Sequence, residues 1–313
     1  MNYAVIDLGS NSVRLSVYRH TDGGIDKIFN RKEMAGLAGY SAKGILDPAG
    51  IRKACSVVND FKETAYRFVE ADNLYLFATA SIRNIKNREE AVRIIARETT
   101  LTPDVLEGHE EAALGFSGVS NNMNCENGVM IDVGGASTEL VLFKEHKAVS
   151  FVSLPIGCLN LAVAHVGRII PKESEWKKIK AEAREQFNGI DWDKEIRCPL
   201  MVGTGGTLRA VLKLSGAVFD LPPGQNVLQA RHIKEIAELL RDNKENIYHM
   251  VYKVTPERLM TISTGLIILL QAIRRFGCET IAVSRFGIRE GYLMDRLLTE
   301  HEKRESNERR GTD

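Results

Sequence analysis

The sequence has few cysteines, and their placement argues against two kinds of site. Its 313 residues include five cysteines, an odd number, and no Cys-x-x-Cys or His-x-x-x-His pair occurs. A disulfide framework uses an even set of cysteines and a structural zinc site uses paired ligands, so we expect neither. Unpaired cysteines suit a reducing compartment, and we therefore expect a cytoplasmic protein.

Long apolar runs and a strong net charge are also absent. The longest apolar run, Leu266–Leu270, is far shorter than the roughly 20 residues that span a bilayer. The start, Met1-Asn2-Tyr3, lacks the basic segment of a signal peptide. A net charge of +1 provides no overall field that attracts nucleic acid or membranes, so we expect neither partner. What remains is an ordinary globular composition, with a length that suggests two domains.

Two segments 125 residues apart repeat one pattern, namely an apolar run, Asp-x-Gly, a turn of small residues and a second apolar run. An ungapped alignment of residues 7–18 with 132–143 pairs Asp7 with Asp132, Gly9 with Gly134, Ser12 with Ser137 and Leu15 with Leu140. This strand–turn–strand repeat predicts two related domains, each presenting a carboxylate and a turn to a shared cleft.

Turns of this composition suit phosphate binding, because small residues let backbone N–H groups approach an anion closely. The expected phosphate-binding residues are Gly9, Ser10, Asn11 and Ser12 in the first turn and Gly134, Gly135 and Ser137 in the second. Asp7 and Asp132 are the expected ligands of Mg²⁺, with Mn²⁺ as an alternative, because hard cations prefer carboxylate, phosphate and water oxygens. The plain alternative is that both turns are ordinary hairpins.

Hydrophobic periodicity predicts an α/β protein in which one order of elements occurs twice. Strands are expected over 3–9, 12–20, 25–37, 74–80 and 103–106, with helices over 47–70, from 87 and from 109. The order restarts with strands at 128–133, 138–146 and 147–154, helices from 157 and over 172–187, and a strand at 199–202. Helices over 206–214, 231–242 and 256–276, a strand at 281–284 and a helix over 287–299 complete it. The expected domains are 1–124 and 125–300, followed by a polar tail over 301–313.

Charged residues at three places are candidates for chemistry. Glu110 and Glu111 fall in the first turn of a predicted helix, where acidic residues also stabilise the helix dipole; a carboxylate there can take a proton from water. Glu139 is either an exposed strand residue or a carboxylate that positions metal or water. Arg83 is either a solvated loop residue or a phosphate ligand.

The segment Gly203-Thr-Gly-Gly-Thr207 resembles the start of a dinucleotide-binding fingerprint, but Leu208 replaces its final glycine. We expect instead a third phosphate-contacting loop that includes Gly205, or a tight helix start. Arg285 and Arg289, near the last strand and helix, are further candidates for phosphate contact.

Six motifs in order resemble the exopolyphosphatase/guanosine pentaphosphate phosphohydrolase family, usually written Ppx/GppA. They are residues 6–12, 78–83, 108–112, 131–140, 203–207 and 284–291. The resemblance implies two ribonuclease-H-like domains of the acetate kinase/sugar kinase/Hsp70/actin class with an interdomain cleft. It also implies Mg²⁺-dependent hydrolysis of terminal phosphoanhydride bonds.

By position, the resemblance implies that Glu111 is the catalytic base and that Asp132 and Glu139 lie at the metal and attacking water. It further implies that Asp7 and both turns bind phosphate and that Arg83 contacts the phosphate chain.

Two positions depart from the family pattern. Ala136 replaces the third glycine of the second turn. If that position needs a positive φ or a very close approach, alanine costs about 1 kcal/mol or more and weakens phosphate contact. Ala113 stands where an arginine is frequent, so one cationic contact is expected to be missing.

We therefore expect a cytoplasmic exopolyphosphatase that releases terminal orthophosphate from polyphosphate by water attack. Guanosine pentaphosphate (pppGpp) is the competing substrate, and guanosine tetraphosphate a related ligand. A kinase of the same superfamily and a non-catalytic phosphate or alarmone sensor are the alternatives from other classes. Long family members carry further helical domains, and this chain resembles the short, two-domain type. The oligomeric state stays open, although homodimers are common among soluble enzymes.

Overall fold

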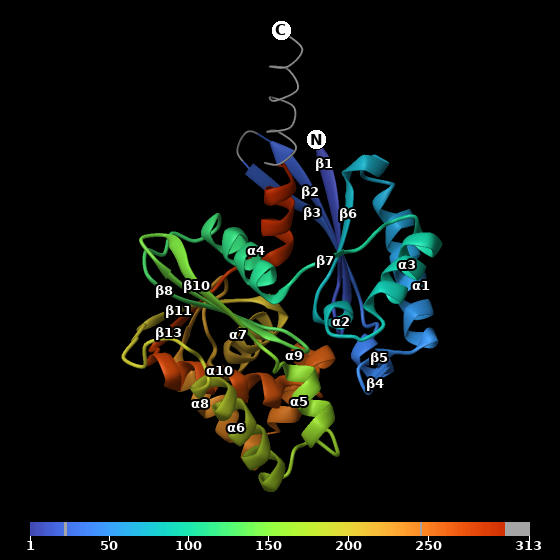
Figure 1. Cartoon of the computed structure of the whole chain (residues 1–313). Coiled ribbons are helices and arrows are strands. Elements are labelled where there is room, and N and C mark those ends of the chain that lie inside the picture. Colours follow the sequence, from blue (N-terminus) through green and yellow to red (C-terminus); the bar gives the residue numbers. More distant parts are fainter. Residues whose placement is uncertain (22–23, 245, 298–313) are drawn as a thin grey trace. The chain divides into compact units, whose positions relative to one another are not determined.

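The computed structural model describes residues 1–21, 24–244 and 246–297, which form two compact units. The first unit contains residues 1–121 and returns at 286, and the second contains residues 122–285 (Figure 1). The sequence placed the chain after 285 in the second domain, whereas the structure groups it with the first unit. The expected tail over 301–313 lies outside the described residues.

The first unit is built on a five-stranded sheet of order β3-β2-β1-β6-β7. Its strands are β1 (Asn2–Leu8), β2 (Val13–Thr21), β3 (Gly24–Glu33), β6 (Leu74–Ala78) and β7 (Asp104–Val105). β1 pairs antiparallel with β2 and parallel with β6, so it is central. A short hairpin of β4 (Ser41–Ala42) and β5 (Ile45–Leu46) follows β3.

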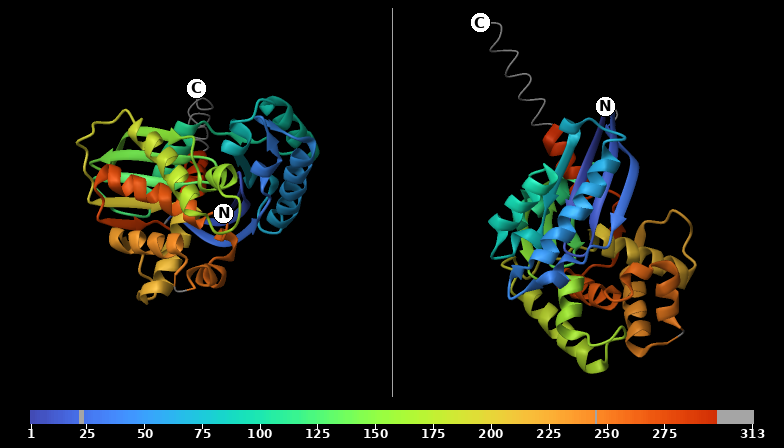
Figure 2. Two further views of the ribbon diagram at one scale, coloured as in Figure 1. Left: turned by 90° about the horizontal axis from the view of Figure 1, so that it is seen from below. Right: turned by 90° about the vertical axis from the view of Figure 1, so that its right-hand side faces the viewer.

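Side chains of β1 alternate between two cores, as a strand buried on both faces requires. Ala4, Ile6 and Leu8 join the core formed with α1 (Pro48–Ala65) and α3 (Arg88–Thr99), helices that lie side by side along the sheet (Figures 1 and 2). Tyr3 and Val5 join a second core.

The second core explains why the chain after 285 returns to the first unit. Residues 288–297 are helical and pack Tyr292 and Leu293 against Tyr3 and Val5 of β1. α4 (Gly108–Ser120) supplies the partly buried Leu114 to the same cluster. Sequence periodicity identified this helix but could not show which sheet it covers.

An ionic cluster around the buried Glu290 carboxylate also fixes this helix to the sheet. The Glu290 carboxylate accepts a hydrogen bond from the Tyr18 hydroxyl at 2.7 Å and lies 2.6 Å from Lys27 Nζ. Burial alone would raise the pKa of Glu290, but the charges of Arg289 and Lys27 outweigh it, so the pKa lies below the usual 4.5. Burial and the Glu290 charge raise the pKa of Tyr18, so the tyrosine stays protonated.

The second unit repeats the first arrangement and adds one strand, in the order β10-β9-β8-β11-β13-β12. Its strands are β8 (Gly128–Val133), β9 (Thr138–Lys144), β10 (Lys147–Leu154), β11 (Leu200–Thr204), β12 (Val227–Gln229) and β13 (Thr280–Val283). β8 pairs antiparallel with β9 and parallel with β11, as β1 does with β2 and β6. The structure thus confirms the α/β class with two sheets.

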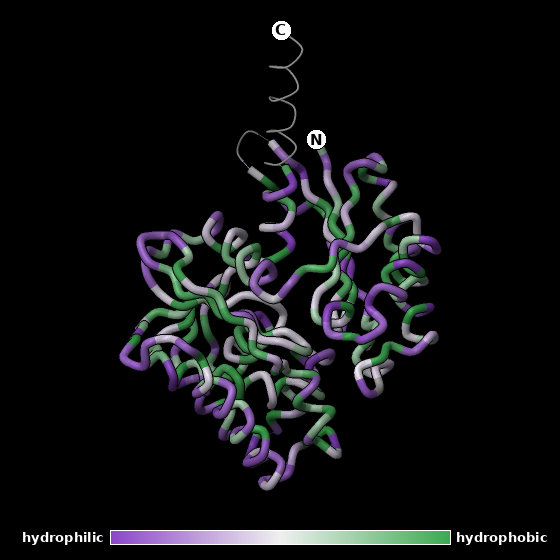
Figure 3. Tube along the Cα trace, viewed as in Figure 1, coloured by the Kyte–Doolittle hydropathy of each residue, from purple (hydrophilic) through white to green (hydrophobic). Residues whose placement is uncertain are grey.

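Six helices accompany this sheet among the described residues. They are α5 (Cys158–His165), α6 (Glu173–Asn188), α7 (Gly205–Phe219), α8 (Ala230–Asp242), α9 (Ile247–Val254) and α10 (Ile262–Phe276). Apolar residues concentrate in the strands and on the inner helix faces (Figure 3). No described helix is long and apolar enough to cross a membrane.

Several expected boundaries were wrong. The helix predicted from 256 begins at Ile262, because Pro256–Arg258 forms a separate 3₁₀ turn. β12, with three residues, is too short to show alternation, and α9 was not predicted. Arg83 lies at the end of the short helix α2 (Ala80–Arg83) rather than in a loop.

Candidate functional site

The first small-residue turn joins β1 to β2 and is held through its carbonyl groups. Leu8 O accepts a hydrogen bond from Ser81 Oγ at 2.8 Å. Ser10 O accepts from Ala38 N at 3.0 Å, and Asn11 O accepts from Gly36 N at 2.9 Å. A Cβ on Gly9 would lie 2.9 Å from Ser12 O, so the turn closes too tightly for a larger residue there.

The second turn joins β8 to β9 and closes in the same way. Gly134 N donates to Ser137 O at 2.9 Å, and a Cβ on Gly134 would lie 3.0 Å from that oxygen. The start of α5 supplies donors to the turn: Cys158 N to Gly134 O at 2.9 Å and Leu159 N to Gly135 O at 2.8 Å.

The remaining carbonyl of the second turn is held by a side chain. Asn160 Nδ2 donates to Ala136 O at 3.0 Å, while Asn160 N donates to Gly135 O at 3.0 Å. A Cβ on Gly157 would lie 2.4 Å from Gly135 C, so α5 packs directly on the turn because residue 157 is glycine. All three turn carbonyls therefore face the start of α5.

This arrangement determines where the turn's N–H groups point. In a trans peptide the C=O and the following N–H point in opposite directions. The N–H groups of Gly135, Ala136 and Ser137 therefore point away from α5, and within the described chain none of them donates a hydrogen bond to protein. Successive outward N–H groups form an anion-binding nest.

The first turn also has outward-pointing backbone N–H groups, at two residues instead of three. Because Ser10 O and Asn11 O are taken by backbone donors, the N–H groups of Asn11 and Ser12 point the opposite way. The side chain of Ser10 is buried, and those of Asn11 and Ser12 are half-buried. Each unit thus presents backbone donors at its predicted phosphate turn.

Ala136 does not carry the strain that the sequence suggested for this position. The described residues with positive φ do not include Ala136, so its methyl group costs nothing through backbone conformation. The positive-φ condition for a weakened turn is therefore not met, whereas the condition of a very close approach by phosphate stays a prediction.

Asp132, at the end of β8, packs against the start of α7. A Cβ on Gly205, whose φ is +81°, would lie 1.9 Å from Asp132 Oδ1. Any side chain at 205 would displace the carboxylate. The backbone N-terminus of α7 also favours a negative charge here through the helix dipole. Gly205 therefore makes room for the predicted metal ligand, a role that the sequence did not indicate.

Glu139 lies directly opposite Asp132 on β9. It is only 2% exposed, and Ser153 Oγ donates to its Oε1 at 2.9 Å, so it is not the exposed strand residue of the alternative interpretation. Opposite residues of an antiparallel pair share a face with Cβ atoms about 5 Å apart, and like charges there are unfavourable. A cation beside the two carboxylates would relieve that repulsion.

The corresponding pair in the first unit is already balanced in charge. Asp7 lies opposite Arg14 on β2, and Arg289 Nε lies 3.9 Å from Asp7 Oδ2. Arg289 is itself buried and donates to Ser16 Oγ at 2.8 Å. Asp7 therefore faces arginine side chains, whereas Asp132 faces a second carboxylate across its strand pair.

Glu110 and Glu111, at the start of α4, make different contacts. Glu110 Oε2 accepts from Glu107 N at 2.7 Å and so caps the helix. Glu111 Oε2 lies 2.6 Å from Arg83 Nη1, which also donates to Leu106 O at 2.9 Å. The structure thus brings the predicted base and the predicted phosphate ligand into contact, with side chains 15% and 8% exposed.

The predicted residues form one set in each unit. The first contains Asp7, Gly9, Ser10, Asn11, Ser12, Arg83 and Glu111, and the second contains Asp132, Gly134, Gly135, Ser137, Glu139 and Gly205. Their meeting in a shared cleft stays a prediction. Within the described ranges no group of three His, Cys, Asp or Glu side chains is suited to a metal, but two carboxylates with phosphate oxygens and water suffice for Mg²⁺.

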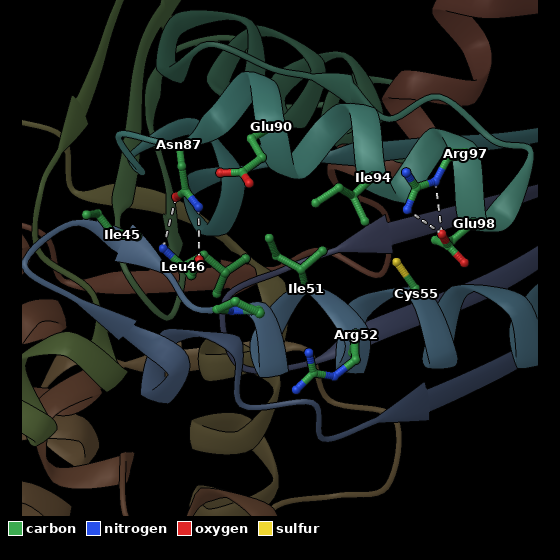
Figure 4. Close-up of a pocket in the computed structure, with 11 residues that line it drawn as sticks. Ile45, Leu46, Ile51, Arg52, Cys55, Asn87, Glu90, Ile94, Arg97 and Glu98 are labelled. Atoms are coloured by element: carbon green, nitrogen blue, oxygen red, sulfur yellow. Dashed lines mark hydrogen bonds and ion pairs between the residues drawn. The ribbon is translucent and has the colours of Figure 1, made fainter.

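A pocket of about 630 Å³ between α1 and α3 lies apart from these residues (Figure 4). Its lining includes Leu46, Ile51, Cys55 and Ile94, and no predicted site residue contributes to it. Asn87 closes one end through two hydrogen bonds with the Leu46 backbone.

Sequence comparison gives a family match. The model of the Ppx/GppA phosphatase family matches residues 16–300. A guanosine-5'-triphosphate,3'-diphosphate pyrophosphatase of Aeromonas hydrophila is 28% identical over 309 residues, covering 96% of this chain and 60% of that protein. The chain thus spans 60% of the length of this curated relative.

Structural comparison agrees. The crystal structure of the Aquifex aeolicus Ppx/GppA family member is 28% identical with a TM-score of 0.76, covering 96% of this chain and 98% of that one. An exopolyphosphatase structure from Cytophaga hutchinsonii is 17% identical with a TM-score of 0.82, covering 95% and 98%, and shows likeness of fold.

Proposed function

The chain belongs to the Ppx/GppA phosphatase family, and we propose that it hydrolyses terminal phosphoanhydride bonds, releasing orthophosphate from the ends of inorganic polyphosphate. The observation that carries the proposal is the pair of turns whose carbonyls are bonded inward and whose N–H groups point outward. Two such nests, each beside an aspartate, suit a substrate with several adjacent phosphates.

Water attack requires a base and a means of offsetting charge on the transferred phosphoryl group. Glu111 is the base in this proposal, and the charge-assisted hydrogen bond from Arg83 Nη1 fixes its carboxylate. The Nε and Nη2 atoms of Arg83 carry three further N–H donors, so Arg83 can hold Glu111 and also contact phosphate. The outward N–H groups of both turns stabilise the developing negative charge.

A divalent metal fits the second unit. Asp132 and Glu139 would hold Mg²⁺, or Mn²⁺, which when bound would neutralise phosphate charge and polarise the terminal phosphoryl group. Ser153 and the backbone at Gly205 keep the two carboxylates in place. Asp7 stays a predicted ligand, although its neighbouring arginines already supply positive charge.

Hydrolysis of the 5'-terminal phosphate of pppGpp is the second candidate, favoured by the similarity to the Aeromonas hydrophila protein named guanosine-5'-triphosphate,3'-diphosphate pyrophosphatase. Both substrates end in a phosphoanhydride, so the same turns serve either. A phosphate or alarmone sensor that does not turn over is the third, although the ordinary φ of Ala136 removes one reason for it.

The test is orthophosphate release from long-chain polyphosphate, short-chain polyphosphate and pppGpp in parallel with Mg²⁺, with EDTA as control. Faster release from polyphosphate supports the exopolyphosphatase proposal, and the two chain lengths rank its preference. Faster release from pppGpp selects the nucleotide. No release from folded protein rejects both hydrolase proposals and leaves the sensor.

A further inference from the structure

We propose that Asn160 is a positioning residue that orients the second phosphate turn, an inference that rests on the proposed function. Its side chain connects three backbone segments. Asn160 Oδ1 accepts from Gly157 N at 2.7 Å, and Nδ2 donates to Ala136 O at 3.0 Å and to Pro155 O at 3.1 Å. The residue thus caps α5 and holds the turn at once.

The bond to Ala136 O acts directly on one anion-binding donor. The Ala136 carbonyl and the Ser137 N–H belong to one peptide plane and point in opposite directions. Gly134 O and Gly135 O are held by backbone N–H groups of α5, which no substitution except proline removes, whereas Ala136 O is held by a side chain. Rotation of this peptide would turn the Ser137 N–H away and bring a carbonyl oxygen toward the phosphate.

Replacing Asn160 by Asp separates its two roles, capping α5 and holding the second turn. The aspartate keeps an oxygen that accepts from Gly157 N and has nearly the same shape. It replaces the amide NH₂ by a second oxygen, which would face the carbonyl oxygens of Ala136 and Pro155. The aspartate therefore still caps α5, but its second oxygen repels the carbonyl oxygens of Ala136 and Pro155.

Asn87 provides a matched control. Its Oδ1 accepts from Leu46 N at 3.0 Å and its Nδ2 donates to Leu46 O at 3.0 Å, so Asn87→Asp also loses an amide-to-carbonyl bond (Figure 4). Both asparagines are half-buried. Asn87 lies beside the pocket between α1 and α3, outside the predicted phosphate turns.

The experiment has a binding arm that needs no turnover. Tripolyphosphate is titrated into ¹⁵N-labelled wild-type, Asn160→Asp and Asn87→Asp proteins, and the amide signals of Gly135, Ala136 and Ser137 are followed. We expect Asn160→Asp to weaken tripolyphosphate binding at least tenfold and to reduce the Ser137 shift most. Asn87→Asp should match wild type.

The kinetic arm measures kcat and KM for polyphosphate with the same three proteins. Loss of one oriented oxyanion donor lowers kcat by about 10²–10³-fold, so we expect kcat/KM for Asn160→Asp to fall by about 10²-fold or more. If Asn160→Asp does not fold, the same constants are measured for Asn160→Ala. This variant loses the hydrogen bond to Ala136 O without adding a repulsive oxygen.

The outcomes separate this inference from the proposed function. Amide shifts without phosphate release in wild type reject hydrolysis but leave the binding arm valid for Asn160. Equal tripolyphosphate affinity and equal Ser137 shifts in wild type and Asn160→Asp overturn the inference, as does an equal loss in Asn87→Asp. A wild-type turn whose amides do not respond to tripolyphosphate also overturns it.

Discussion

The close approach of Gly205 to Asp132 predicts that Gly205→Ala will inactivate the protein without unfolding it. The added Cβ would lie 1.9 Å from Asp132 Oδ1. Ordinary carbon–oxygen contacts begin near about 3.3 Å, so the carboxylate or the start of α7 must move by more than about 1 Å. A misplacement of about 1 Å near a reacting group can cost about 10²-fold in rate.

The substitution also acts on the backbone. Gly205 has a φ of +81°, a conformation that costs an alanine about 1–2 kcal/mol. We therefore expect the free energy of unfolding to fall by about that amount and kcat/KM to fall by about 10²-fold or more. Phosphate release gives the rate, and urea unfolding gives the stability.

Gly216→Ala is the matched control, because it changes the same residue type in the same helix. A Cβ at Gly216 meets nothing within 4 Å, and alanine in a helix interior is favoured over glycine by about 0.5–1 kcal/mol. We expect this variant to keep full activity and to gain stability. Folded Gly205→Ala protein with kcat/KM within about threefold of wild type would refute the role given to Asp132.

Three further predictions follow from the described contacts. Glu111→Gln should lower kcat by about 10²–10⁴-fold with KM little changed, whereas Glu110→Gln keeps an oxygen that accepts from Glu107 N and should cost only about 0.3–1 kcal/mol of stability, from the lost charge at the start of α4, and little rate; equal kinetic losses would remove Glu111 from the role of base. Asp132→Asn should weaken Mn²⁺ binding, measured by electron paramagnetic resonance, and unchanged affinity would place the metal elsewhere. Because the pKa of Glu290 is lowered in the folded state, its stabilisation is present above about pH 4.5 and is lost as the pH falls further. Glu290→Gln should cost about 1.5–3 kcal/mol at pH 7 and flatten that acid limb in urea unfolding, because Tyr18 and Lys27 lose a charged hydrogen-bond partner; an unaltered acid limb would contradict this.

Much of the fold could be predicted from the sequence, because strand alternation and helix periodicity are local signals. The repeat at Asp7 and Asp132 predicted two related sheets, and the strand orders confirm it. The assignment of the helix over residues 288–297 to the first unit could not be predicted. It depends on Tyr292 and Leu293 packing against a strand nearly 290 residues earlier in the chain, a choice between two similar sheets that periodicity does not encode.

The residues of the candidate site were foreseeable by type, but their partners were not. Glu110 and Glu111 look equivalent in sequence, and only three-dimensional contacts separate a helix cap from a partner of Arg83. Asn160 and Gly157 gave no sequence signal, since their role arises from hydrogen bonds and packing against a turn more than 20 residues earlier. The Asn160 side chain nevertheless holds one of the three turn carbonyls.

Hydrolysis of polyphosphate in H₂¹⁸O with Mg²⁺ tests whether water attacks a terminal phosphorus. Mass spectrometry of the released orthophosphate reports the origin of its new oxygen. Attack by water at the terminal phosphorus places one ¹⁸O atom in each orthophosphate released, at a rate that falls with Glu111→Gln. Absence of release, or orthophosphate without the label, would contradict it.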